Sequence, residues 1–256
     1  MMAEVVALSL VLLPASVLFI GVFFQPRLIM QLTQRLFPSV LFLWPTKSKV
    51  VALTIDDSPH DAVTPEVLDV LQEHDCKATF FIIGSYLDKW PHLVDQMHKE
   101  GHELGNHTME DTASWKLSKD ELERQLLETD SRLQPYWGAN SIKWFRPGHG
   151  WFTQSMMTTL RKHGYRVALG SLFPHDPFFV DQGPLIAKYL LARVYPGAVI
   201  ILHDGKPSRR QLIDALKILL PELKRRGYKV VTLSSLVGEK PKAGSASNAG
   251  RPSKIQ

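Results

Sequence analysis

Cysteine is nearly absent from this chain of 256 residues, which contains only Cys76. One cysteine excludes an intrachain disulfide and does not indicate a redox compartment. Cys76 lies at a predicted turn between a helix and a strand, and no neighbouring residue marks its thiol as a nucleophile. We therefore interpret it as a structural residue.

Acidic charge is scarce at both ends of the chain. Residues 1–49 contain four basic residues and one acidic residue, and residues 238–256 contain the same numbers. The region between them, residues 50–237, contains 22 basic and 23 acidic residues and is nearly neutral. Because a nucleic-acid-binding domain carries its basic charge on the folded domain itself, the overall net charge of +5 does not indicate a nucleic-acid partner.

Charge is absent altogether from Val5 to Phe24, a run of twenty mostly apolar residues. Twenty helical residues span roughly 30 Å, the thickness of a bilayer's hydrocarbon core, so the run predicts a transmembrane helix. A cleaved signal peptide fits less well, because no basic residue precedes the run and no small-residue cleavage site follows it. We expect residues 1–27 to form a single-pass membrane anchor. The basic residues that follow favour a cytoplasmic location for the rest of the chain by the positive-inside rule, but the sequence leaves the sidedness open.

Two further segments flank the predicted folded domain. Residues 28–47 stay apolar and form an expected membrane-proximal linker, which either lies on the membrane or packs beneath the domain. Residues 238–256 are rich in Gly, Ser, Ala, Pro and Lys, a composition typical of a disordered basic tail. The predicted domain therefore comprises residues 48–237.

Strand-like and helix-like segments alternate through this domain. Such alternation predicts a parallel sheet with helices between the strands. Seven units of this kind predict an α/β fold, an open or distorted (β/α)7 barrel, preceded by the N-terminal transmembrane helix. The seven β-branched or aromatic segments lie at about residues 50–56, 78–83, 102–106, 143–147, 165–171, 198–203 and 228–233.

Capping residues mark several helix boundaries. Thr64 and Pro65 place a capping hydroxyl and a first-turn proline before one predicted helix. Ser118 and Glu121 form a capping box at the start of a long amphipathic helix. The last long helix is predicted to end at Gly227.

Polar, chemically useful residues are concentrated in five short segments at or just past the ends of predicted strands. Each alone is a weak signal: Asp56 and Asp57 also suit a turn after a strand, and His107 and Asp111 can be four residues apart by chance. In barrels of this kind the carboxyl ends of the strands form the face that carries the active site. The gathering of all five on one rim predicts a metal-dependent hydrolase. The segments are residues 54–59, 106–111, 145–150, 171–176 and 200–205.

These segments resemble the motifs of a known family, the carbohydrate esterase family of polysaccharide deacetylases. The resemblance extends over about residues 50–236, and its first and fifth motifs are the most specific. The matches in chain order are residues 54–59, 107–111, 146–150, Asp176 in the fourth motif, and 202–204. The resemblance implies an N-deacetylase that acts on a carbohydrate containing N-acetylglucosamine.

The resemblance also implies a role for individual residues. Asp57 and His107 are expected to hold a divalent metal ion, zinc or else manganese, magnesium or cobalt, with Asp111 as a third ligand. Asp56 is expected to act as a general base on water, and Arg146 is expected to keep its carboxylate ionised.

The remaining expected roles concern the leaving group and the substrate. His203 is expected to protonate the departing amine while Asp176 orients its imidazole. A backbone N–H near His149 is expected to stabilise the oxyanion, and Leu202 to line the pocket for the acetyl methyl group. The expected substrate-binding residues are Leu202, Pro147, His149 and Trp151.

One position departs from the family pattern in a way that affects the metal. The family's second metal-binding histidine is Asp111 in this chain. Asp57 and Asp111 together neutralise a divalent charge. We therefore predict a weaker Lewis acid and a preference shifted from zinc toward harder ions such as manganese or magnesium.

Two alternative functions remain open at this point. One is an amidohydrolase of a small linear or cyclic amide, and the other is a non-catalytic glycan-binding protein that lost turnover together with the second histidine. The presence of Asp56, Arg146 and His203, which binding alone does not require, argues against the second. The sequence gives neither the identity of the glycan nor the oligomeric state.

Overall fold

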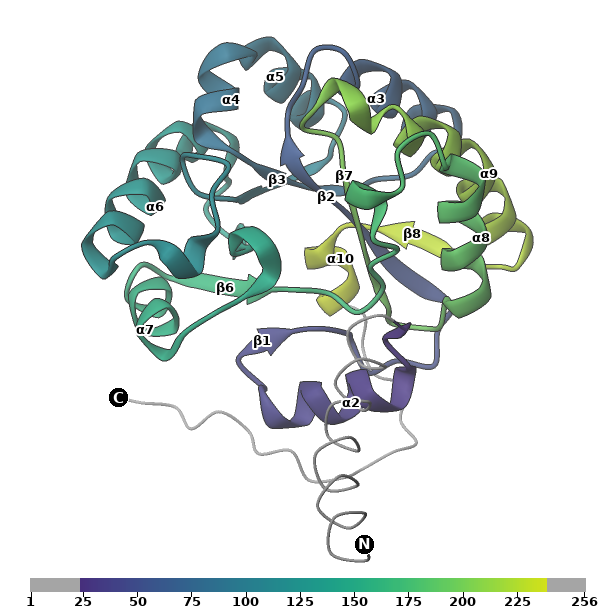
Figure 1. Cartoon of the computed structure of the whole chain (residues 1–256), viewed down its shortest axis with the longest axis horizontal. Coiled ribbons are helices and arrows are strands. Elements are labelled where there is room, and N and C mark those ends of the chain that lie inside the picture. Colours follow the sequence, from purple (N-terminus) through teal and green to yellow (C-terminus); the bar gives the residue numbers. More distant parts are fainter. Residues whose placement is uncertain (1–23, 239–256) are drawn as a thin grey trace, which may run out of the picture.

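The computed structural model describes residues 24–238, which form an α/β fold built on one curled parallel sheet (Figure 1). The strand order is β1-β6-β5-β4-β3-β2-β7, and β8 pairs with β2. Strands β2 to β8 are the seven predicted ones, whereas β1 was not predicted. The strands are β1 Val40–Leu41, β2 Val50–Ser58, β3 Thr79–Ile82, β4 Glu103–Asn106, β5 Lys143–Phe145, β6 Tyr165–Ala168, β7 Val199–His203 and β8 Lys229–Val231.

The two ends of the sheet are joined by the chain that leaves β6. The carbonyl oxygen of Leu41 in β1 accepts hydrogen bonds from the N–H groups of Leu169 and Gly170. The carbonyl oxygen of Val199 in β7 accepts hydrogen bonds from the next two residues, Ser171 and Leu172. One short segment therefore bonds to both edges and curls the sheet. The prediction of a distorted α/β barrel is confirmed in this form.

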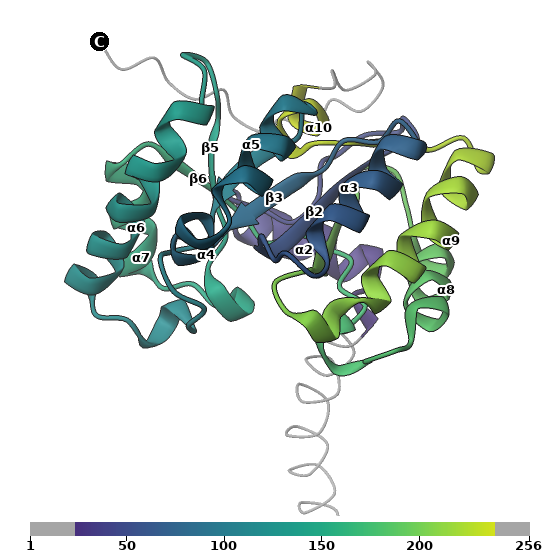
Figure 2. The same cartoon turned by 90° about the horizontal axis from the view of Figure 1, so that it is seen from above.

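Helices surround the sheet in two groups (Figure 2). Helices α8 and α9 pack together on one flank, and α6 packs beside α7 on the other. The α-helices are α2 Arg27–Leu36, α3 Thr64–Glu73, α4 Gly84–Lys89, α5 Pro91–Lys99, α6 Lys119–Leu133, α7 Gln154–Lys162, α8 Gly183–Arg193, α9 Gln211–Arg225 and α10 Leu233–Gly238. Short 3-10 turns are η1 Ser114–Lys116, η2 Gln134–Tyr136, η3 Gly148–Gly150, η4 Asp176–Phe178 and η5 Pro207–Arg209.

Two of the three capping predictions are confirmed, and of the third only the first-turn proline Pro65 in α3 is confirmed. The Ser118 hydroxyl accepts a hydrogen bond from the Glu121 N–H at the start of α6, as predicted. Helix α9 ends just before Gly227, whose φ of 79° is favourable only for glycine. Thr64, in contrast, is not the cap of α3, because its hydroxyl donates to the buried carboxylate of Asp204 at 2.6 Å.

The hydrophobic core is centred on β2, which is buried along almost its whole length. Its alternate side chains enter two different core clusters, with Leu53 facing helices α3 and α9 and Ala52 facing the side that contains Trp144. Burial on both faces explains why β2 is a continuous apolar run rather than an alternating one. This rigid central strand carries Asp56 and Asp57 at its carboxyl end.

The segment between the predicted anchor and the domain packs against the fold. Residues 28–47 form most of α2 and all of β1, and β1 pairs with β6, so this segment adds an edge to the sheet. Most of the predicted transmembrane run and of the predicted tail lies outside the described residues. Within residues 24–238, no helix combines the length and the apolar character needed to cross a bilayer.

Candidate active site

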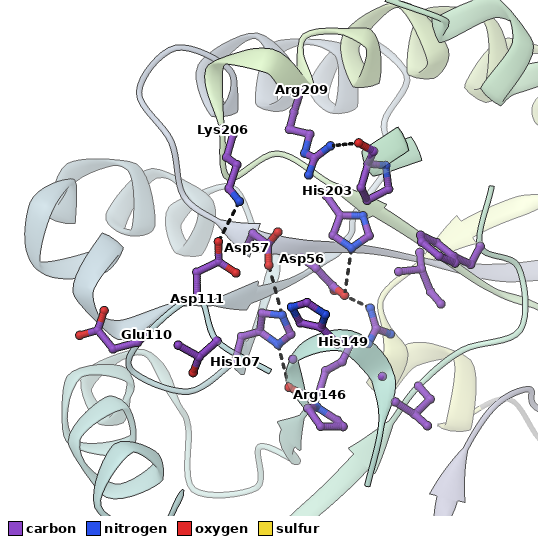
Figure 3. A pocket seen from close by; sticks show the side chains of 18 of the residues that line it. Asp56, Asp57, His107, Glu110, Asp111, Arg146, His149, His203, Lys206 and Arg209 are labelled. Carbon is purple, nitrogen blue, oxygen red and sulfur yellow. Dashed lines mark hydrogen bonds and ion pairs between the residues drawn. The ribbon is translucent and has the colours of Figure 1, made fainter. Parts of the chain in front are cut away.

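A pocket of about 470 Å³ opens at the carboxyl ends of β2, β4, β5 and β7 (Figure 3). The chain turns there bring together side chains that are far apart in the sequence. The lining residues are Asp56, Asp57, His107, Glu110, Asp111, Thr112, Arg146, Pro147, Gly148, His149, Gly150, Leu169, Phe173, Pro177, Phe178, Ile201, His203, Lys206 and Arg209.

Asp56 and Asp57 are consecutive, yet both line the pocket. In a regular strand they would point to opposite faces of the sheet. The backbone prevents this, because Asp57 has a φ of 64° and the register between β2 and β3 shifts between Ile55 and Ser58. Such irregularities are frequent at functional sites, and they turn a second carboxylate toward the same space.

Asp56 is held by a buried arginine. Nη1 of Arg146 lies 2.5 Å from Oδ1 of Asp56 and 2.8 Å from the hydroxyl oxygen of Thr54. Nε of Arg146 donates to the carbonyl oxygen of Ala168 at 2.9 Å. Burial lowers the pKa of Arg146, and the Asp56 carboxylate partly offsets this effect. The arginine thus supplies a fixed positive charge beside Asp56 inside the barrel.

His203 faces Asp56 across the pocket. The two residues are register partners on β2 and β7, and Nε2 of His203 lies 3.9 Å from Oδ2 of Asp56. Nδ1 of His203 donates to Oδ1 of Asp176 at 3.1 Å, and the His203 backbone N–H donates to Oδ2 at 3.0 Å. Burial alone would lower the pKa of His203, but the carboxylates of Asp176, Asp57 and Asp56 together outweigh it and raise the pKa to about 9. His203 is therefore a cation at neutral pH, ready to donate a proton.

Asp57 and His107 lie together on the other side of the pocket. Nδ1 of His107 donates to the carbonyl oxygen of Arg146 at 2.7 Å, and Nε2 lies 3.3 Å from Oδ1 of Asp57. Burial would raise the pKa of Asp57, but the hydrogen bond with His107 and the nearby cations outweigh it and lower the pKa. A backbone acceptor on Nδ1 leaves Nε2 of a neutral His107 to bind an ion, an arrangement typical of metal-binding histidines.

Asp111 is paired with Lys206 rather than with Asp57 or His107 (Figure 3). Its Oδ2 lies 3.0 Å from Nζ of Lys206, and this contact raises the pKa of the lysine. Among residues 24–238, no three His, Cys, Asp or Glu side chains gather closely enough to hold a metal ion. The nitrogen and carboxylate donors of His107 and Asp57 fit a divalent ion. The third position predicted for Asp111 requires that its contact with Lys206 be exchanged, so this role stays a prediction.

The loop after β5 forms one wall of the pocket. His149 has a φ of 63°, and the N–H groups on either side of it are already bonded, Gly148 to the Ser114 hydroxyl and Gly150 to the Pro147 carbonyl oxygen. The His149 N–H has no hydrogen-bond partner within residues 24–238. It is thus free to donate a hydrogen bond, and its role in stabilising an oxyanion stays a prediction.

Known proteins are similar in sequence to this chain along most of its length. The sequence profile of the polysaccharide deacetylase family matches residues 44–168. A peptidoglycan-N-acetylglucosamine deacetylase of Bacillus cereus is 35% identical over 211 residues, which cover 81% of this chain and 98% of the relative. The chain belongs to the polysaccharide deacetylase family, carbohydrate esterase family 4. It is therefore a deacetylase, a hydrolase of carbon–nitrogen bonds other than peptide bonds.

Two further similarities bear on the deacetylase site. A chitooligosaccharide deacetylase of Sinorhizobium fredii is 36% identical over 199 residues, covering 73% of this chain and 92% of the relative. A solved family 4 acetyl xylan esterase from Clostridium thermocellum, in complex with a cobalt ion, has a TM-score of 0.67 at 31% identity. The matched region covers 74% of this chain and 91% of the esterase chain. A divalent ion bound to a family member is consistent with the donors found here.

The structure corrects the prediction for one substrate-binding residue of this deacetylase. Leu202 does not line the pocket, because it points into the core beside α9 and is fully buried. Side chains alternate along a strand, so the pocket-facing neighbour of His203 on β7 is Ile201, two positions earlier. Pro147 and His149 line the pocket as predicted. Trp151 is exposed just beyond that wall and is not part of the lining.

Several residues of the site were missed by sequence reasoning. Lys206 and Arg209 follow β7 and reach the pocket from its far side, and Phe173 and Phe178 border it from the segment after β6. Strand alternation would have identified Ile201. The long or loop-borne side chains carry no comparable sequence signal, because their reach depends on the path of the loops.

A buried carboxylate behind the pocket was also missed. Asp204 is fully buried and accepts hydrogen bonds from the hydroxyls of Ser58 and Thr64, each at 2.6 Å. Burial raises the pKa of Asp204 to about 7, although these two hydrogen bonds oppose the shift. The next residue, Gly205, packs against the backbone of Asp57, and a Cβ at position 205 would lie 2.2 Å from the Asp57 carbonyl oxygen. Asp204 and Gly205 thus fix the chain that carries Asp57.

Proposed function

We propose that this protein is a metal-dependent hydrolase that removes N-acetyl groups from a glycan containing N-acetylglucosamine, either chitin-like or peptidoglycan. One observation carries the proposal. Asp56 and His203 face each other at 3.9 Å, the first paired with Arg146 and the second protonated through Asp176. A carboxylate and an imidazolium set apart by their environments are a base and an acid for the same reaction.

The chain's own residues then divide the work of amide hydrolysis. Asp56 accepts a proton from the attacking water, and the His149 N–H donates to the oxyanion of the tetrahedral intermediate. His203 gives its proton to the departing amine, with Asp176 fixing the imidazole. A divalent ion held by Asp57 and His107, with Asp111 as third ligand once it leaves Lys206, would supply Lewis-acid activation.

Support for a glycan substrate comes from the relatives and from the pocket. The two relatives, named for peptidoglycan-N-acetylglucosamine and for chitooligosaccharide, match this chain over nearly their whole length. Phe178 lines the pocket and is largely exposed, and exposed Trp151 stands beside the wall formed by His149. Aromatic faces at a pocket mouth suit the apolar faces of sugar rings.

The proposal includes a single-pass membrane anchor at the N-terminus. It rests on the charge-free run from Val5 to Phe24, which is long enough to span a bilayer.

The test is acetate release by the full chain from chitooligosaccharides and from peptidoglycan, after chelation and after divalent ions are returned. We expect release only with the ion, and a loss of about 10²–10⁴-fold in kcat for Asp56→Asn. Asp61→Asn, which alters an exposed carboxylate in the loop after β2, is the matched control and is expected to retain activity. Metal-independent release or full activity of Asp56→Asn would refute the mechanism. Glycan binding without any release would identify a non-catalytic glycan-binding protein instead.

A further inference from the structure

Helix α2 presents a row of leucine side chains on its outer surface. Leu28, Leu32 and Leu36 follow each other at four-residue spacing and are 67%, 47% and 74% exposed. A helix turns about 100° per residue, so this spacing places all three on one face. The opposite face packs against the protein, since Met30 is buried in the core and Gln34 hydrogen-bonds to the backbone of β1 and the residues after it.

The exposure is not a sign of a loosely held helix, because both ends of α2 are fixed. Before the helix, the side-chain amide of Gln25 donates to the Phe173 carbonyl oxygen at 3.1 Å, and its oxygen accepts from the Phe173 N–H at 2.7 Å. After the helix, the ring of Phe37 packs edge-on against Phe152 with centroids 5.5 Å apart. The leucine row is therefore a permanent surface of the fold.

These two contacts also place α2 beside the pocket. Phe173 lines the pocket, and Phe152 follows the pocket wall that ends at Gly150. Helix α2 therefore runs along the outer side of two segments that border the pocket, at one edge of the molecule (Figure 1). Both segments also carry exposed aromatic side chains, those of Trp151 and Phe178.

Other exposed apolar side chains on the helices are isolated. Leu127 on α6, Leu185 on α8 and Ile218 on α9 are each the one exposed large apolar side chain of their helix within residues 24–238, as is normal for a protein surface. A row of three leucines on one helix is different, because concentrated apolar surface marks an interaction site.

The charges and the neighbouring sequence indicate what covers the row. Residues 24–49 contain four basic residues and no acidic residue. The charge-free run from Val5 ends at Phe24, only three residues before α2 begins at Arg27. An amphipathic helix with apolar residues on one face and basic residues near it is typical of helices that lie in a membrane interface.

We propose that α2 lies in the plane of a lipid membrane, with Leu28, Leu32 and Leu36 inserted at the boundary between headgroups and acyl chains. Arg27 and Arg35 then lie at the level of the anionic headgroups. The helix holds the adjoining pocket wall at the membrane surface. This placement concerns a surface outside the pocket, so it stands or falls independently of the proposed reaction.

The test uses the full chain in vesicles of phosphatidylglycerol and phosphatidylcholine, with a fluorescent label on one introduced cysteine. The labelled positions are Leu28→Cys, Leu32→Cys and Leu36→Cys, with Leu127→Cys as the matched control because its exposure of 42% is close to that of Leu32. The unmodified chain gives the labelling background of Cys76, whose thiol is buried and has its pKa raised to about 11 by burial. A thermal transition like that of the unmodified chain confirms that each variant is folded.

We expect a quencher attached to the lipid acyl chains to remove roughly half or more of the fluorescence at all three α2 positions, at similar depth. The label at position 127 is expected to be quenched by aqueous iodide and not by the lipid quencher. Equal lipid quenching at positions 32 and 127 would overturn the proposal. A steep gradient from position 28 to position 36 would also overturn it, since α2 would then cross the interface end-on. Protection from both quenchers would show that protein, either the N-terminal run or a second copy of the chain, covers the row instead.

Discussion

The two sides of the pocket are built in different ways. The proton-transfer side comprises Asp56, Arg146, His203 and Asp176, and the metal side comprises Asp57, His107 and Asp111. On the proton-transfer side each reacting group has a buried partner already in contact. On the metal side only two of three expected ligands are together, and the third is paired with Lys206 at the pocket mouth. The proton-transfer side is thus preassembled, whereas the proposed metal side would need an exchange of ion pairs before Asp111 could join it.

Asp176→Asn breaks the preassembled side and is expected to have a larger effect than the changes at Asp111, Lys206 and Asp204. Loss of the orienting carboxylate should lower kcat/KM by about 10–100-fold. Asp176 makes the largest contribution among the carboxylates that raise the pKa of His203 to about 9, and activity that needs charged His203 is lost as pH rises through that value. Without this charge the alkaline limb of the pH–activity profile should move to lower pH. Asp181→Asn, which alters an exposed carboxylate five positions after the buried Asp176, should leave the limb in place. An unshifted limb in Asp176→Asn would show that His203 is not the acid.

Changes at Asp111 and Lys206 sharpen the description of the metal side. Asp111→His should tighten zinc binding on the order of tenfold, because imidazole suits zinc better than a carboxylate does. Lys206→Met frees Asp111 and removes a nearby positive charge, so the affinity for manganese should rise about fivefold. Both affinities are measured by calorimetric titration of chelator-treated protein, with Lys188→Met on α8 as an exposed control. Zinc affinity equal in the unmodified chain and in Asp111→His would contradict the predicted preference for harder ions.

Asp204→Asn tests the support shared by both sides and should have the smallest effect. It weakens the two hydrogen bonds that fix the chain after β2, so we expect a loss of about 1 kcal/mol in the free energy of unfolding near pH 5. Burial raises the pKa of Asp204 to about 7 from its ordinary value of 3.8, so the folded state binds this proton more tightly than the unfolded state. The contribution of the group to stability is therefore full below pH 3.8 and is lost as pH rises through about 7. The free energy of unfolding is measured by denaturation at several pH values. The difference between the unmodified chain and Asp204→Asn should become smaller from pH 5 to pH 8. A constant difference would mean that Asp204 does not titrate in this range.

The sequence predicted the main fold well because its strands are buried on both faces. Seven β-branched or aromatic runs correspond to β2 to β8, and the joining helices have clear apolar spacing. Strand β1 escaped prediction because it has only two residues within an apolar stretch next to the anchor. Its pairing with β6 is decided by tertiary contacts that no local pattern shows.

The positions of site residues could be predicted from the sequence where the residues directly follow strands. They could not be predicted where the path of a loop determines the position. Asp56, Asp57 and His203 gather because parallel strands end on one rim. The prediction for Leu202 was wrong because side chains alternate along β7, which turns Ile201 and His203 to the pocket and Leu202 to the core. The contact of Asp111 with Lys206 joins two loops separated by 95 positions, and its formation depends on loop paths.

The contacts of the Arg146 guanidinium determine how this family member tolerates substitution at position 146. It bonds to Thr54 and Asp56 on β2 and to the Ala168 carbonyl oxygen on β6, and it stacks over the ring of Phe81 on β3. The same side chain therefore braces three strands from inside the barrel and holds the proposed base Asp56 at its mouth. Substitutions at position 146 should be tolerated as poorly in a mutational survey that measures protein abundance as in a survey that measures turnover. At this position, selection for foldability and selection for catalysis cannot act separately.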